Sequence, residues 1–121
     1  MSKRILVVEG DEDSRRILRD LLASADYQML EAEDGKQGIA VAEAERPDLI
    51  LMDIQLPLVD GYEATRRLKA SPELRSIPII VVTSLALSDG EAKARVAGCD
   101  DYITKPYSPR QLLAKIKEQL L

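Results

Sequence analysis

Four polar residues in this chain could carry out chemistry together: Glu9, Asp53, Thr83 and Lys105. Each lies at or just after the end of a predicted strand. Taken alone, each has an ordinary explanation, as a loop acid, a helix cap, a strand-end β-branched residue or a solvated amine. Because ligands of parallel sheets bind outside the carboxyl ends of the strands, we expect the four to share one crevice. An acid, a hydroxyl and an ammonium at the point where the winding of the sheet reverses indicate a functional site.

Asp53 is the central residue of this set, and it lies within the segment Asp48 to Pro57. The apolar run of this segment opens after a proline and stops at the carboxylate, which predicts a buried strand with Asp53 at its carboxyl end. Two other apolar runs, Ile5 to Val8 and Ile79 to Val82, also end in polar side chains. The three runs therefore predict three buried strands that deliver polar groups to one edge.

Hydrophobic periodicity, capping residues and prolines predict five strands that alternate with five helices. The predicted strands are Ile5 to Glu9, Gln28 to Glu33, Asp48 to Asp53, Pro78 to Thr83 and Asp101 to Thr104. The predicted helices start with the acids at 11 to 13 and then cover Gly35 to Glu45, Asp60 to Lys69, Ser88 to Ala97 and the segment after Ser108 and Pro109. The first helix is expected to bury a stripe formed by Ile17, Leu18, Leu21 and Leu22.

This alternation predicts an α/β fold, because parallel strands need crossover connections and the helices then cover both faces of the sheet. The first, third and fourth strands are continuous apolar runs, so they should lie in the middle. The second and fifth strands are more polar and should lie at the edges. The expected architecture is a flavodoxin-like, doubly wound five-stranded parallel sheet in the order 2-1-3-4-5, with its ligand crevice between the first and third strands.

Composition limits the function classes that remain. A length of 121 residues fits one domain, and no apolar run approaches the ~20 residues that span a bilayer, so we expect a cytoplasmic protein without a membrane segment. The single cysteine and the absence of histidine exclude an internal disulfide and a histidine-containing zinc site. A net charge of −4 and an aromatic content of 3% argue against nucleic-acid binding.

The sequence resembles the receiver domains of two-component response regulators, including the single-domain, chemotaxis-type proteins. The resemblance covers essentially the whole chain and implies one receiver domain over residues 1–121 with no output domain. It rests on Ile-Leu-Val-Val-Glu at 5–9, Leu-Met-Asp-Ile-Gln-Leu-Pro at 51–57, Asp-Gly at 60–61, Val-Thr-Ser at 82–84, Ala-Gly-Cys-Asp-Asp-Tyr at 97–102 and Lys-Pro at 105–106.

The resemblance implies that Asp53 accepts a phosphoryl group from the phosphohistidine of a sensor histidine kinase or a histidine phosphotransfer protein. A carboxylate is a weak nucleophile, so neutralisation of charge must carry the reaction. In this family Mg²⁺, Lys105 and the Thr83 hydroxyl share the phosphoryl oxygens. The implied Mg²⁺ ligands are Glu9, Asp53 and the backbone carbonyl of Gln55. Such a protein accepts a phosphoryl group and has the capacity to autodephosphorylate, but it is not a conventional enzyme.

The resemblance also carries expectations about signalling. Thr83 and Tyr102 would form a coupled switch, and the peptide bond between Lys105 and Pro106 would be cis. A downstream protein would dock on the fourth helix, fifth strand and fifth helix, with Lys93, Arg95 and Tyr102 in reach. Whether the domain is a monomer or a homodimer stays open, as does the ordinary interpretation of Tyr102 as a half-buried edge-strand residue.

Gly10 departs from the family pattern, because receiver domains nearly always carry two adjacent acids after the first strand. Here the pair is Glu9 and Gly10, with glycine where the directly metal-coordinating carboxylate is expected. We therefore expect weakened Mg²⁺ binding. Asp11 could replace the missing ligand if the glycine re-aims the loop, or it could simply cap the first helix.

Three other functions compete with a phosphorylated receiver. Gly10 favours a pseudo-receiver, an unphosphorylated protein-binding module. A phosphatase with an aspartyl nucleophile is disfavoured because such enzymes resemble Asp-x-Asp, whereas Gln55 holds the second position here. A nucleotide or flavin binder is disfavoured because Gly10 is the only glycine in the first turn.

Overall fold

The computed structural model describes residues 2–84 and 89–121 and forms one five-stranded parallel sheet in the order β2-β1-β3-β4-β5. The strands are β1 (Arg4–Val8), β2 (Gln28–Ala32), β3 (Leu49–Asp53), β4 (Ile79–Ser84) and β5 (Asp101–Lys105). The helices are α1 (Glu12–Ser24), α2 (Gly35–Glu45), α3 (Gly61–Ala70), α4 (Gly90–Ala97) and α5 (Pro109–Leu120). The predicted doubly wound, flavodoxin-like architecture is confirmed.

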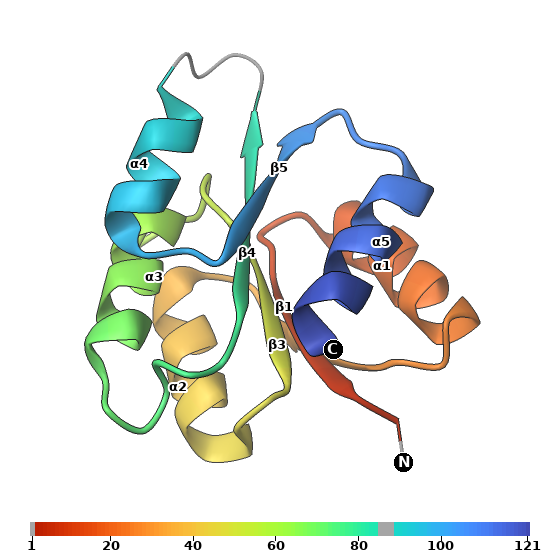
Figure 1. Ribbon diagram of the computed structural model, residues 1–121, viewed down its shortest axis with the longest axis horizontal. Helices are drawn as coiled ribbons and strands as arrows, with labels where there is room; N and C mark the ends of the chain where they lie inside the picture. The colour runs from red at the N-terminus through yellow and green to blue at the C-terminus, as the bar shows by residue number, and fades with distance from the viewer. Residues whose placement is uncertain (1, 85–88) are drawn as a thin grey trace.

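Helices cover both faces of the sheet, with α2, α3 and α4 on one side and α1 and α5 on the other (Figure 1). Alternate residues of the strands therefore enter two separate apolar layers. Ile50 and Val81 pack toward α2, α3 and α4, whereas their neighbours Leu51 and Ile80 pack toward α1 and α5. The central strands β1, β3 and β4 are buried on both faces, as their continuous apolar runs predict, and β2 and β5 are partly exposed edges.

Four helices begin with a side-chain cap that the sequence places directly after a loop. Asp11, Asp34, Asp60 and Ser108 each accept a hydrogen bond from a backbone N–H in the first turn of the helix that follows. Ser108 forms a full capping box with Gln111, and Gly98 ends α4 in the left-handed region, at φ 97°. The four caps fix where α1, α2, α3 and α5 leave the carboxyl edge of the sheet.

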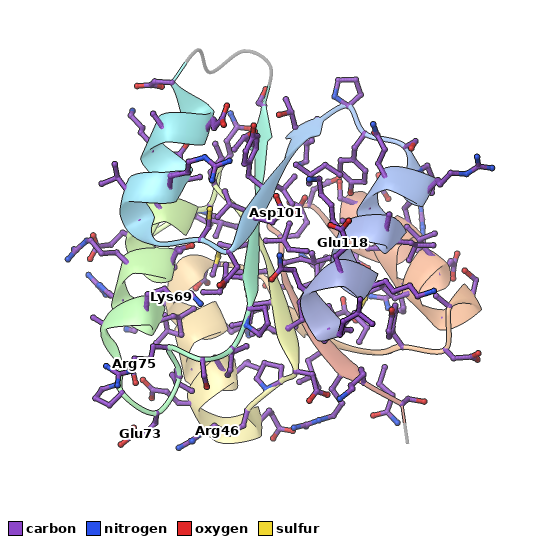
Figure 2. All side chains as sticks on the ribbon, in the orientation of Figure 1. Arg46, Lys69, Glu73, Arg75, Asp101 and Glu118 are labelled. Carbon is purple, nitrogen blue, oxygen red and sulfur yellow. The ribbon has the colours of Figure 1, made fainter. Side chains whose placement is uncertain are left out.

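The opposite end of the sheet is made of α–β connections, and Arg46, Glu73 and Arg75 lie there in Figure 2. Lys69 joins two of these connections. Its ammonium contacts Asp100 at 2.6 Å and donates to the carbonyls of Arg75 and Ile77. Lys69 thus ties the connection between α3 and β4 to the start of β5.

One prediction of local structure is wrong, and another is not tested. Ile17 is 65% exposed, and the buried residues of α1 are Arg15, Leu18 and Leu22. At about 100° per residue, Ile17 lies about 130° around the helix from the middle of the face formed by Arg15, Leu18 and Leu22, so it points outward. The predicted start of the fourth helix at Ser88 lies outside the described residues.

Within 2–84 and 89–121, no helix has the length and apolar character needed to cross a membrane.

Thr65 supplies a test of the packing of α3. Its side chain is fully buried, and its hydroxyl has no hydrogen-bond partner among the described residues. We expect Thr65→Val to raise the free energy of unfolding by about 1 kcal/mol, because valine has the same shape and removes a buried unpaired polar group. Urea unfolding measures this change. Thr83→Val is the matched control and should not stabilise, since the Thr83 hydroxyl is hydrogen-bonded; equal gains for both variants would contradict the interpretation.

Candidate functional site

The carboxyl edge of the sheet brings together two carboxylates and an ammonium. Lys105 Nζ lies 3.0 Å from Asp53 Oδ2 and 3.3 Å from Glu9 Oε1. Asp53 ends β3, Glu9 follows β1 and Lys105 ends β5, so the site needs three strands in register. Glu9 and Asp53 are each only 6% exposed, whereas Lys105 is partly exposed. The predicted convergence of these three side chains is confirmed.

The three side chains line an open cleft of about 570 Å³ that also includes Gly10, Asp11, Ser14, Gln55 and Pro57. The backbone N–H of Gln55 donates to Asp53 Oδ1 at 3.0 Å, while Oδ2 faces Lys105. Asp53 is therefore held at both oxygens and still borders the cleft. A carboxylate in this position can act as a nucleophile toward a group that enters from solvent.

The charges of the site depend on one another. Burial raises the pKa of Glu9, and its hydrogen bond and charge interaction with Asp53 raise it further. Burial alone lowers the pKa of Lys105, but its hydrogen bond and charge interaction with Asp53, together with Glu9, raise it overall. Lys105 therefore remains an ammonium, and it can neutralise negative charge that develops on a ligand beside Asp53.

Thr83 lies at the same edge but does not belong to the lining of the cleft. It is 3% exposed, and its hydroxyl contacts the Ile103 carbonyl at 3.4 Å and Thr104 Oγ1 at 3.3 Å. The predicted role of Thr83 as a wall of the pocket is therefore not seen in this conformation. A side-chain rotation or backbone shift is needed before the hydroxyl can face Asp53.

Tyr102 lies away from the cleft, between α4 and α5. Its ring centre is 5.3 Å from the Arg95 guanidinium and 6.0 Å from Lys115 Nζ, which are cation–π distances. Its hydrogen bond to Glu91 raises the pKa of the phenol. Lys93 of α4 lies over the ring of Tyr62, with its Nζ 6.0 Å from the ring centre.

The structure shows Asp11 in the capping role that the sequence allows. Its carboxylate caps α1 by accepting from the Ser14 N–H at 3.0 Å, and its own N–H donates to Glu9 Oε2 at 3.0 Å. Gly10 has no left-handed backbone, and a Cβ there would meet its nearest atom at 3.5 Å, an ordinary contact. The backbone at Gly10 is thus one that other residues can adopt, and Asp11 caps α1 while it also lines the cleft.

The site can be compared with the needs of Mg²⁺, which takes oxygen ligands and keeps several waters. Glu9, Asp53 and Gln55 border the cleft, and carboxylates and a backbone carbonyl are suitable donors. No group of three or more acidic, histidine or cysteine side chains is arranged for a metal within the part of the chain that is described. The donor set fits Mg²⁺ but supplies two carboxylates only. The peptide bond between Lys105 and Pro106 is cis, as expected.

Arg15 is a residue that the sequence analysis missed. It is 5% exposed and donates from Nη1 to the Glu9 carbonyl at 2.7 Å. A signal was present, because Arg15 precedes Leu18 by three residues and Leu22 by seven, which places it on the buried face of the helix. A charged residue on that face indicates a specific partner.

The fold and the site define a class: a doubly wound α/β domain with a strand-end aspartate paired to a lysine at its carboxyl edge. The chain belongs to the response regulator receiver domain family, whose model matches residues 5–117. It is 42% identical over 120 residues to the polar-differentiation response regulator DivK of Brucella anthropi, and the match covers 99% of this chain and 98% of the relative.

Solved structures show the same fold. A putative response regulator from Chloroflexus aurantiacus superposes with a TM-score of 0.95 at 27% identity, covering 99% of this chain and 98% of that chain. The receiver domain of a sensor histidine kinase from Pseudomonas aeruginosa has a TM-score of 0.92 at 34% identity, with the same coverage, and carries a magnesium ion in its active-site cleft.

The coupled charges predict how Glu9 titrates. Since Asp53 raises and Lys105 lowers the pKa of Glu9, Asp53→Asn should move it down toward the ordinary glutamate value and Lys105→Met should move it up. Carboxyl-carbon NMR across a pH series measures both shifts. Asp11, whose pKa is lowered by Ser14, is the internal reference and should stay low in Asp53→Asn. A Glu9 that titrates like a free glutamate in the unmodified protein would refute this account.

Proposed function

We propose that the protein is a response regulator in whose receiver domain Asp53 accepts a phosphoryl group from the phosphohistidine of a sensor histidine kinase or a phosphotransfer protein. The observation that carries the proposal is the buried Asp53 carboxylate, 3.0 Å from the Lys105 ammonium and bordering an open cleft. The chain has no histidine, so the phosphohistidine lies outside these 121 residues. The chain acts as a phosphoryl acceptor that can lose the group again by hydrolysis, rather than as a conventional enzyme.

Each residue of the cleft has a separate role in the proposed phosphoryl transfer. Asp53 supplies the attacking oxygen, and Lys105 lies where it can contact an oxygen of the incoming phosphoryl group. Glu9, Asp53 and the Gln55 carbonyl would hold Mg²⁺, which when bound supplies positive charge to the phosphoryl oxygens. The support for Mg²⁺ is the donor set of this cleft together with the magnesium ion in the Pseudomonas receiver domain.

The proposed output surface is formed by α4, β5 and α5. A groove of about 610 Å³ lies there, lined by residues that include Arg95, Tyr102, Lys115 and Glu118. Figure 2 shows Asp101 on β5 and Glu118 on α5, both of which border it. We propose that this surface docks a downstream protein when Asp53 is phosphorylated, that Thr83 and Tyr102 transmit the change, and that the protein works in the cytoplasm as a monomer or homodimer.

A second candidate is a pseudo-receiver that binds partners without being phosphorylated. Gly10 favours it, since one carboxylate is missing beside Glu9. The intact arrangement of Asp53 and Lys105 favours an active receiver.

Phosphorylation is the direct test between the two candidates. Incubation with a small phosphodonor and Mg²⁺ should add one phosphoryl group, detected by intact mass, and Asp53→Asn should add none. Lys105→Met should slow the labelling by roughly 10²-fold, because it removes a charge aimed at the developing negative oxygen. Absence of labelling in the unmodified protein, at phosphodonor and Mg²⁺ concentrations that label a known receiver domain, would favour the pseudo-receiver.

Gly10→Asp tests the cost of the missing acid. We expect the variant to bind Mg²⁺ at least about tenfold more tightly. The attraction between two unit charges about 4 Å apart, at an effective dielectric constant of about 20, exceeds the free energy that corresponds to a tenfold change in affinity. The added Cβ has room, with its nearest atom at 3.5 Å. Gly10→Asn is the uncharged control of the same size and should bind Mg²⁺ nearly as the unmodified protein does. Equal affinities for Gly10→Asp and the unmodified protein, measured by calorimetry, would show that the glycine costs nothing.

A further inference from the structure

Arg15 is a buried cation that the proposed reaction does not use. It is 5% exposed, and it is the only lysine or arginine among the buried polar side chains of the described residues. Removing a guanidinium from water costs free energy that must be recovered through hydrogen bonds. The contacts of Arg15 therefore indicate what its burial achieves.

Those contacts separate into an outer and an inner group. On the outer side, Arg15 pairs with Glu12, with Glu31 at 3.3 Å and with Glu33 at 3.4 Å. The side chains of Glu12 and Glu33 are 67% and 69% exposed, so these pairs are screened by solvent. The inner contact is the 2.7 Å hydrogen bond from Nη1 to the Glu9 carbonyl, which is buried. A short, charge-assisted bond of this kind is the strong one.

With this inner bond, every polar group of Glu9 has a hydrogen-bond partner. The Glu9 N–H donates to the Ala32 carbonyl at 3.0 Å, and the two carboxylate oxygens accept from Asp11 N–H and Lys105. Arg15 holds the remaining polar group, the carbonyl, and thereby sets the plane of the peptide between residues 9 and 10. Residue 10 is glycine, which restricts its own backbone less than any other residue. The orientation of that peptide thus depends on Arg15 more than it would with a side chain at position 10.

We propose that Arg15 is a positioning residue: by binding the Glu9 carbonyl it keeps the Glu9 carboxylate directed into the cleft, where it faces Lys105 and a bound divalent cation. The proposal rests on the proposed function, since it concerns the same cleft. It adds a role for a residue on α1 that does not line that cleft.

Arg15→Met tests the proposal, because methionine fills the space with an apolar chain and removes the donor. The Asp11 N–H is the reporter, since it donates to Glu9 Oε2. We expect Arg15→Met to shift the amide NMR signals of Gly10 and Asp11 and to weaken Mg²⁺ binding, followed in the same spectra, by about tenfold. Unchanged signals and unchanged Mg²⁺ affinity would overturn the proposal.

Two controls separate positioning from general stabilisation. Arg19→Met removes an arginine of the same helix that donates to Glu31 rather than to Glu9, and it should leave both readouts unchanged. The double variant Glu12→Gln, Glu33→Gln removes two outer ion pairs and keeps the inner bond, so it should also bind Mg²⁺ as the unmodified protein does. If either control loses Mg²⁺ affinity as Arg15→Met does, the charge network rather than the carbonyl contact is responsible, and the proposal fails.

Gly10→Ala provides a further check and Arg15→Lys a fallback. Alanine narrows the backbone freedom at position 10, so Arg15→Met should cost less Mg²⁺ affinity in the Gly10→Ala background; equal or larger losses would count against the proposal.

If Arg15→Met does not fold, Arg15→Lys keeps the cation but not the guanidinium, and signals and affinity equal to those of the unmodified protein would overturn the proposal. Neither readout uses phosphorylation, so a protein that accepts no phosphoryl group would refute the proposed function and leave this test intact.

Discussion

The contact of Lys105 with Glu9 and Asp53 is the interaction on which the rest of the site depends. Two carboxylates that are each 6% exposed and lie at neighbouring strand ends repel one another, and burial further penalises their ionisation. The ammonium, 3.0 and 3.3 Å away, offsets both effects. A ligand that approaches Asp53 therefore meets a site whose negative charge is already partly neutralised, and it competes with the carboxylates for Lys105.

The sheet makes this contact possible because it fixes three strand ends without using their polar side chains. Strands β1, β3 and β4 are held by apolar layers on both faces, and β5 is added to β4 through a ladder that pairs Ser84 with Lys105. Glycine is required at position 61, where α3 begins beside the end of β3, because a Cβ there would lie 2.2 Å from the Asp53 carbonyl oxygen. Core packing and loop geometry thus position the Asp53 backbone, and electrostatics position its side chain.

The sequence allowed the fold and most of the site to be predicted because those features arise from local patterns. Apolar runs indicated which strands are central, and the caps at Asp60 and Ser108 marked where helices begin. The features that escaped prediction depend on tertiary contacts. The direction of the Thr83 hydroxyl is set by acceptors on β5, and the burial of Arg15 is set by a carbonyl six residues earlier in the chain. Spacing places Arg15 on the buried face of α1, but residue type and spacing identify neither its partner nor the direction of the Thr83 hydroxyl.

Thr83 explains how a change at Asp53 could reach a distant surface. Its hydroxyl contacts the Ile103 carbonyl and Thr104, the two residues that follow Tyr102 on β5. Its methyl side faces Gly90, the first residue of α4, where an added Cβ would approach Thr83 to within 3.3 Å. A rotation that turned the hydroxyl toward a phosphoryl group on Asp53 would give up the contacts with β5 and alter the packing beneath the start of α4. Tyr102 belongs to β5, and Arg95 of α4 lies over its ring. One rotation of Thr83 would therefore act on the surface around Tyr102 through both β5 and α4.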